Sequence, residues 1–219
     1  MENKSGNEKK LYILLGLYVT ALCASNLLGG KLMPIGFGDR GLSVSILMFP
    51  FLFLITDIVG EVFGKKKAKQ FVNAGLISLL VLLAFQVFSL NVPGAVPVEW
   101  YETFNESYKT VFSLSISFTI ASILAFFFGQ YVDVFIYHTI KKRMGKRFIW
   151  LRNNVSTAIG QFIDSTIWVY IAFLPKILSG AFGAWELFSL IVIPYWLAKV
   201  IIAIIDTPLC YVGIRWLRS

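Results

Sequence analysis

Long apolar runs constrain the fold of this chain more than any other feature of its sequence. Each run has about 20 residues, the length that an α-helix needs to cross the hydrocarbon core of a bilayer. Six of them are separated by charged or Pro- and Gly-containing segments: about 11–28, 42–60, 71–90, 111–139, 153–174 and 187–212. They fill more than half of the 219 residues and leave no room for a separate soluble domain. The sequence predicts an all-α integral membrane bundle of six helices, a single domain over 1–219 with a tail at 1–10.

The composition excludes several other classes of protein. Hydrophobic residues make up 57% of the chain and charged residues 15%, far from the balance of a water-soluble domain. The two cysteines, Cys23 and Cys210, lie far apart in apolar runs, and there is one histidine, His138. A disulfide scaffold, a CxxC site and a multi-histidine metal centre are therefore not expected. We predict neither a metal nor a cofactor.

The basic residues predict the orientation in the membrane. The net charge is +8, and most of the 20 basic residues lie at one set of helix ends: Lys4, Lys9, Lys10, Lys65–Lys67, Lys69, Lys141–Arg143, Lys146, Arg147, Arg152, Arg215 and Arg218. By the positive-inside rule, both termini are predicted to be cytoplasmic. This topology and the attraction to anionic lipid headgroups account for the charge, so no nucleic-acid partner is expected. The first run resembles a signal peptide, but its length favours a retained helix.

A few polar side chains fall at membrane depth, where they are costly and normally face a bundle interior or a wet cavity. They are Asn26 in the first run, Asp57 and Glu61 in the second, Gln130 and Asp133 in the fourth, Gln161 and Asp164 in the fifth, and Lys199 and Asp206 in the sixth. Asp57 and Glu61 could instead pair with the lysines that follow them. Lys199 must meet Asp206, Asp133, Asp164 or a substrate.

The fourth and fifth runs share a short repeat, Gly129-Gln130-Tyr131-Val132-Asp133 and Gly160-Gln161-Phe162-Ile163-Asp164. In each copy an aromatic residue, Tyr137 or Trp168, follows the aspartate by four positions, so amide, carboxylate and ring share one helical face. The two copies could face one another across a cavity, or merely tie two helices together by hydrogen bonds. Carboxylates, amides and rings together would suit a planar nitrogen heterocycle or a cation.

Five segments resemble the queuosine precursor transporter family, also called vitamin uptake transporters. They are Ser25-Asn26-Leu27 through Lys31; Thr56 to Gly64; Gly129-Gln130 with Asp133; Leu151 to Thr157 followed by Gln161 and Asp164; and Lys199 with Asp206-Thr207-Pro208 and Tyr211. The resemblance implies a multi-pass protein of the cell inner membrane that is not an enzyme. It implies uptake of 7-deazaguanine precursors, the 7-cyano or 7-aminomethyl form or queuine. We predict substrate contacts at Gln130, Asp133, Gln161, Asp164, Trp168, Lys199 and Asn26.

The energy source is a separate question. Because no GxxxxGK[ST] motif occurs, the chain is not expected to hydrolyse ATP itself. Buried ionisable groups favour proton- or ion-coupled secondary transport, with coupling or gating candidates at Asp57, Glu61, Arg152, Asn153 and Asp206. The alternatives are a substrate-binding module energised by separate ATPase subunits, an intramembrane aspartyl protease that uses Asp133 and Asp164, and a purely structural membrane protein. The lipid bilayer is the expected surrounding, and a homodimer stays open.

Overall fold

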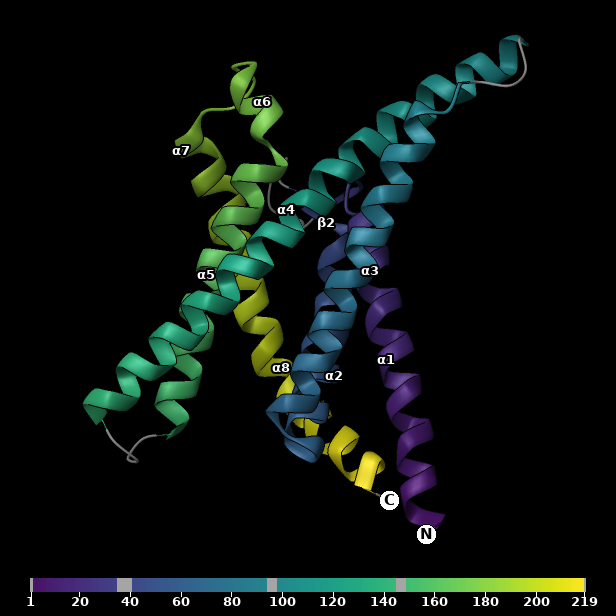
Figure 1. Cartoon of the computed structure of the whole chain (residues 1–219). Coiled ribbons are helices and arrows are strands. Elements are labelled where there is room, and N and C mark those ends of the chain that lie inside the picture. Colours follow the sequence, from purple (N-terminus) through teal and green to yellow (C-terminus); the bar gives the residue numbers. More distant parts are fainter. Residues whose placement is uncertain (1, 35–40, 94–97, 145–148, 219) are drawn as a thin grey trace. The chain divides into compact units, whose positions relative to one another are not determined.

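The computed structural model describes residues 2–34, 41–93, 98–144 and 149–218, and their side chains except at 2–6, 41, 65, 130–138, 140–144, 149–157, 203–204 and 206–207. The chain divides into two compact units (Figure 1). Unit 1 comprises Met1–Ile116 and Ile201–Ser219, and unit 2 comprises Ser117–Val200. Two helices, α4 (Glu99–Met144) and α8 (Ile193–Arg218), contribute to both units.

Unit 1 is built on three helices, α1 (Glu2–Leu28), α2 (Phe49–Phe63) and α3 (Lys65–Asn91), which pack against one another. Pro50 lies in the first turn of α2, where a missing N–H costs no hydrogen bond. Gly64 separates α2 from α3 with a φ of 81°, a conformation that glycine adopts without steric cost. This single residue therefore reverses the chain direction between two long apolar helices.

A short hairpin, which the sequence did not lead us to expect, connects α1 to α2. Strands β1 (Leu32–Pro34) and β2 (Gly41–Ser43) pair antiparallel, with Leu32 opposite Ser43. A 3-10 helix, η1 (Val44–Met48), follows directly. The Ser43 hydroxyl accepts a hydrogen bond from the Ser45 backbone N–H at 3.1 Å and donates one to the Gly29 carbonyl at 2.6 Å. Ser43 thus caps η1 and holds it to the end of α1.

The apolar core of unit 1 joins both ends of the chain. Its buried members come from α1, α2, α3 and the end of α8: Leu11, Leu14, Tyr18, Ala21, Leu52, Ile55, Ile58, Val59, Phe71 and Leu217. Lys10 Nζ donates to the Trp216 carbonyl oxygen at 2.8 Å and lies 5.4 Å from the centre of its indole ring. The start of α1 and the end of α8 therefore lie together within unit 1 (Figure 1).

Unit 2 contains the remaining part of α4, helix α5 (Ile149–Ala172), two short helices, α6 (Leu174–Leu178) and α7 (Ala184–Leu187), a π-helical turn η2 (Phe188–Val192), and the start of α8. Val169, Leu187 and Val192 form its buried apolar cluster, and aromatic side chains pack around them. Helices α7, η2 and α8 follow one another without a break, so the helical backbone is continuous from Ala184 onward.

Five helical segments within the described residues are long and apolar enough to cross a membrane: Asn7–Leu28, Val44–Phe63, Lys66–Asn91, Glu99–Gly129 and Ala184–Ile202. They overlap the first four predicted runs and the sixth, although the fourth begins and ends earlier than predicted and the sixth ends earlier. The remaining predicted run, 153–174, falls on α5, and the side chains of its first residues lie outside the described part. The all-α membrane fold agrees with the structure, whereas the six-helix count, the cytoplasmic termini and the single-domain organisation stay predictions.

Candidate functional site

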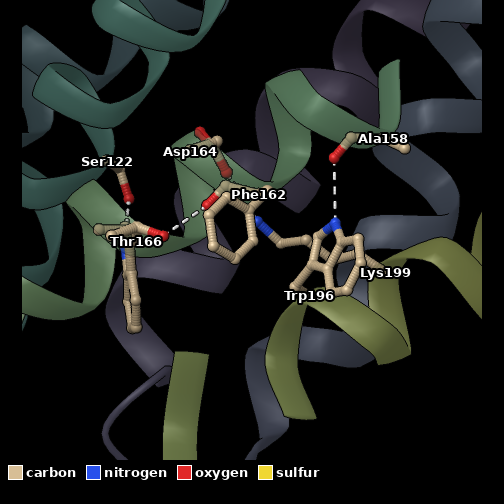
Figure 2. A network of polar contacts seen from close by, with 8 residues as sticks. Ser122, Ala158, Phe162, Asp164, Thr166, Trp196 and Lys199 are labelled. Atoms are coloured by element: carbon tan, nitrogen blue, oxygen red, sulfur yellow. Dashed lines mark hydrogen bonds and ion pairs between the residues drawn. The ribbon is translucent and has the colours of Figure 1, made fainter. Parts of the chain in front are cut away.

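An ion pair with a buried lysine joins two helices of unit 2. Lys199 Nζ, on α8, donates to Asp164 Oδ2, on α5, at 2.7 Å (Figure 2). The lysine side chain is 3% exposed and the aspartate side chain 27%. A cation buried to this extent needs an anionic partner, since removing one member of such a pair leaves an uncompensated charge. Of the partners considered for Lys199 from the sequence, the structure thus supplies Asp164.

Helix α4 approaches this pair closely at a glycine. A Cβ atom added at Gly129 would lie 3.5 Å from the Asp164 Cβ, 3.7 Å from Asp164 Oδ1 and 4.0 Å from the Gly160 carbonyl oxygen. Gly129 and Gly160 are the first residues of the two copies of the repeat. The structure therefore brings the repeats together at their glycines, with Asp164 beside the point of contact.

One wall of the site is aromatic and rigidly held. The Trp168 Nε1–H donates to the Ser122 hydroxyl at 3.0 Å. The Trp168 ring is stacked with Tyr195, at 5.7 Å between centroids and 15° between planes, and Phe118 lies 5.1 Å away on a tilted plane. A hydrogen bond and two ring contacts from α4 and α8 thus fix the indole on α5.

A second indole lies one turn before Lys199 on α8. The Trp196 Nε1–H donates to the Ala158 carbonyl at 3.0 Å, and its ring meets Phe162 edge to face at 5.5 Å (Figure 2). In the same view, Phe162 and Lys199 lie between Trp196 and the Asp164 carboxylate. Trp168 and Trp196 therefore give this region two indole rings, and the N–H group of each already donates a hydrogen bond within the protein.

Two buried polar atoms of α5 have no hydrogen-bond partner among the described residues, Gln161 Oε1 and Ser165 Oγ. Both are close in sequence to Asp164, and positions 161, 165 and 168 follow the helical repeat, so they share a face. An unsatisfied buried polar group costs about 1–3 kcal/mol, and native structures contain few of them. Such groups are expected where a ligand supplies the missing partner.

Several predicted residues lie elsewhere. Asn26 belongs to unit 1, where its Nδ2 donates to the Leu22 carbonyl at 2.9 Å. Asp57 and Glu61 are exposed on α2, also in unit 1. The side chains of the other predicted residues lie outside the described part of the chain: Gln130, Asp133, Arg152, Asn153 and Asp206. Their roles, like those of the residues brought together here, stay predictions.

Ser122 and Ser165 were missed from the sequence, because single serines are common in apolar helices. A signal was nevertheless present. Ser122 precedes Gly129 by seven positions, so two small residues lie on the same face of α4 and allow close approach of α5. Ser165 lies four positions after Gln161 and is 1% exposed. The positions of Ser122 and Ser165 relative to the Gly-Gln-x-x-Asp repeat could therefore have identified both serines.

Long apolar helices, together with ionisable groups within them, are typical of multi-pass membrane transporters. The comparisons with known proteins agree. The family described as "Putative vitamin uptake transporter" matches residues 43–213. The chain therefore belongs to the vitamin uptake transporter family, as the resemblance of its motifs predicted. This is a family of transporters, not of enzymes, and the protein is a multi-pass membrane protein.

Two relatives are informative. The "Probable queuosine precursor transporter" of Bacillus subtilis (strain 168) is 30% identical over 167 residues, which cover 75% of this chain and 68% of that protein. The "Queuosine precursor transporter" of Escherichia coli (strain K12) is 30% identical over 125 residues, 57% of this chain and 52% of that protein. The match thus spans about half the length of the E. coli relative. No solved structure matches the chain.

Proposed function

We propose that this protein takes up 7-deazaguanine precursors of queuosine across the cell inner membrane and binds them in unit 2, around the Lys199–Asp164 pair. The substrate class is taken from the names of the two relatives. The observation that carries the location is the ion pair itself, a 2.7 Å contact between groups that are costly to bury.

The donors and acceptors of the pair match the polar edge of a guanine-type base. That edge presents two adjacent donors, the ring N1–H and the 2-amino group, next to one carbonyl acceptor. A carboxylate can accept two parallel N–H bonds, and an ammonium donates. Asp164 would accept from the two donors, and Lys199 would donate to the carbonyl. Without substrate the two side chains satisfy one another, so the base must insert between them or displace one of them.

The remaining contacts come from groups that lack a partner or offer a flat surface. Gln161 Oε1 and Ser165 Oγ, which have no partner among the described residues, would meet the pyrrole N–H or the 7-substituent. Trp196 would stack on the ring, since base–aromatic stacking contributes about 1–3 kcal/mol per base. Trp168, which is already stacked with Tyr195, would contact the edge of the base. Gln130 and Asp133, in the other copy of the repeat, and Asn26 stay candidates for substrate contact.

For the energy source we propose proton- or ion-coupled secondary transport. Asp164 would exchange Lys199 for substrate during each cycle, and the movement of a coupling ion would be linked to that exchange. Asp57, Glu61, Arg152, Asn153 and Asp206 stay candidates for coupling or gating. A module energised by separate ATPase subunits is the competing reading. The purified protein in liposomes distinguishes them, because a secondary transporter accumulates substrate when only an ion gradient is imposed.

Binding to the purified protein in detergent, measured by calorimetry, tests the proposed substrate and site. The ligands are 7-cyano-7-deazaguanine, 7-aminomethyl-7-deazaguanine and queuine, with guanine and riboflavin as comparisons. We expect saturable binding of at least one deazaguanine, lost in Asp164→Ala and retained in Glu106→Ala, which removes an exposed carboxylate from unit 1. Folded protein that binds none of the deazaguanines would overturn the substrate, and unchanged binding by Asp164→Ala would overturn the site.

A further inference from the structure

A shallow pocket of about 80 Å³ lies between α1 and α3 in unit 1, and none of its lining residues belongs to the site proposed above. Its apolar floor and polar rim come from six residues: Leu11, Leu15 and Phe71, and Tyr12, Lys67 and Gln70. Leu11 and Phe71 are buried, whereas the Tyr12 side chain is 68% exposed. The pocket is therefore amphipathic, with hydrocarbon surface inside and a phenol, an amide and an ammonium around it.

The pocket lies near the ends of two membrane spans. The apolar segment of α1 begins at Asn7 and that of α3 at Lys66, so the lining residues fall in the first turns of both. At 1.5 Å per residue, these turns correspond to the boundary between headgroups and acyl chains. An aromatic residue such as Tyr12, with a wet end and an apolar body, is typical of this depth.

Basic side chains surround this end of unit 1. Lys66 and Lys69 flank the pocket on α3, and Lys9 precedes it on α1. The contact between Lys10 and Trp216 brings the end of α8, with Arg215 and Arg218, to the start of α1. Glu8 on α1 and Glu61 near the end of α2 are exposed as well, but basic residues outnumber them. The beginning of α3 also carries the positive end of a helix dipole next to Lys67.

We propose that this pocket binds one anionic phospholipid of the surrounding bilayer. The phosphate would lie against Lys67 and Gln70, with Tyr12 beside the glycerol, and the first acyl carbons would cover Leu11, Leu15 and Phe71. The apolar floor favours a lipid over free phosphate, which would gain nothing from it. The positive surroundings favour an anionic headgroup over a zwitterionic one.

Native mass spectrometry of the full chain in detergent tests the proposal, with dioleoyl-phosphatidylglycerol and dioleoyl-phosphatidylcholine added in competition. We expect preferential retention of one phosphatidylglycerol. Lys67→Gln should weaken this retention about five-fold, the effect of one basic residue at a membrane surface. Lys69→Gln removes the same charge from the same helix but not from the pocket lining, and should weaken it clearly less. Tyr12→Ala, which keeps the charge, should also weaken retention.

Three outcomes would overturn the proposal. Equal retention of the two lipids would show that the pocket does not distinguish an anionic headgroup from a zwitterionic one. Equal losses in Lys67→Gln and Lys69→Gln would show a diffuse basic surface without a site. Displacement of the lipid by excess inorganic phosphate would show an anion site that does not use the apolar floor. Circular dichroism of each variant excludes misfolding, and none of these readouts depends on deazaguanine binding.

Discussion

The polar contacts between helices differ in kind between the two units. In unit 1, Gln86 Nε2 donates to the Ser115 hydroxyl at 2.7 Å, and Ser115 in turn donates to the Asn26 carbonyl at 2.9 Å. These contacts join the side chains of α3 and α4 to the backbone of α1 at Asn26, and all three residues are at most 4% exposed. In unit 2, an ion pair joins α5 and α8, and two polar atoms of α5, Gln161 Oε1 and Ser165 Oγ, have no hydrogen-bond partner among the described residues.

We interpret this difference between the polar contacts of the two units as one between helix packing and substrate binding. A closed network of amides and hydroxyls satisfies itself and holds helices together where no hydrophobic effect acts between them. An ion pair next to unsatisfied acceptors is a poor way to stabilise helices, because charge burial is costly and the unsatisfied groups add to that cost. If the proposed function is correct, the contacts named in unit 1 contribute to stability and the groups named in unit 2 contribute to substrate binding. The following changes test this contrast, in order of expected effect.

The largest effect is expected from Asp164→Ala. Uptake of a radiolabelled deazaguanine by cells should fall to background, because the variant lacks the acceptor for the base and deprives Lys199 of its carboxylate. Breaking a buried pair costs about 3–5 kcal/mol, so the thermal stability of the purified protein should fall as well.

The double variant Asp164→Ala/Lys199→Met separates these two effects. Removing both charges of a buried pair is often neutral for stability, so the melting temperature should recover. Uptake should not recover, since both proposed substrate contacts are gone. Normal uptake by the double variant would contradict a substrate role for the pair.

A smaller effect is expected at the close approach of α4 and α5. Gly129→Ala places its Cβ 3.5 Å from the Asp164 Cβ, an ordinary contact, and should leave uptake nearly unchanged. Gly129→Leu overpacks the contact, which typically costs about 1–3 kcal/mol, and should displace the Asp164 carboxylate. Initial rates of uptake at matched expression should fall about ten-fold or more. Equal rates for the two variants would show that the carboxylate position does not depend on α4.

Two serines offer a matched pair with a still smaller effect. Ser115 is 3% exposed and hydrogen-bonded, and Ser165 is 1% exposed without a described partner. Ser115→Ala should lower the free energy of unfolding by about 1 kcal/mol and leave substrate affinity unchanged. Ser165→Ala should leave stability unchanged or raise it, and weaken binding measured by calorimetry. The reverse pattern would exchange the roles assigned to the two units.

The smallest effect is expected at the contact between the chain ends. Lys10→Gln removes the cation from above the Trp216 ring, an interaction worth about 0.5–1 kcal/mol at exposed sites. A slightly lower melting temperature with unchanged uptake is the expected result. A loss of uptake would mean that this end of unit 1 affects transport directly.

The lengths of the apolar runs in the sequence alone determined that this protein is built from membrane-spanning helices. An unsatisfied peptide group is so costly in hydrocarbon that an apolar run of about 20 residues has to be a helix, whatever its neighbours are. The motifs around Gly129-Gln130 and from Arg152 to Asp164 likewise indicated the family, because they combine polar residues that a purely structural membrane helix does not need. The sequence also identified Asp164, Lys199 and Trp168 as residues of interest.

Only the tertiary structure decided which of these residues meet. Lys199 could have paired with any of three aspartates, since helical periodicity gives the face of one helix but not its rotation against the next. The hairpin at 32–43 depends on the pairing of two three-residue strands, too short to leave a periodic signal. The same limit applies to Ser122 and Ser165, because a hydroxyl becomes informative only when its partner, or the lack of one, is in view.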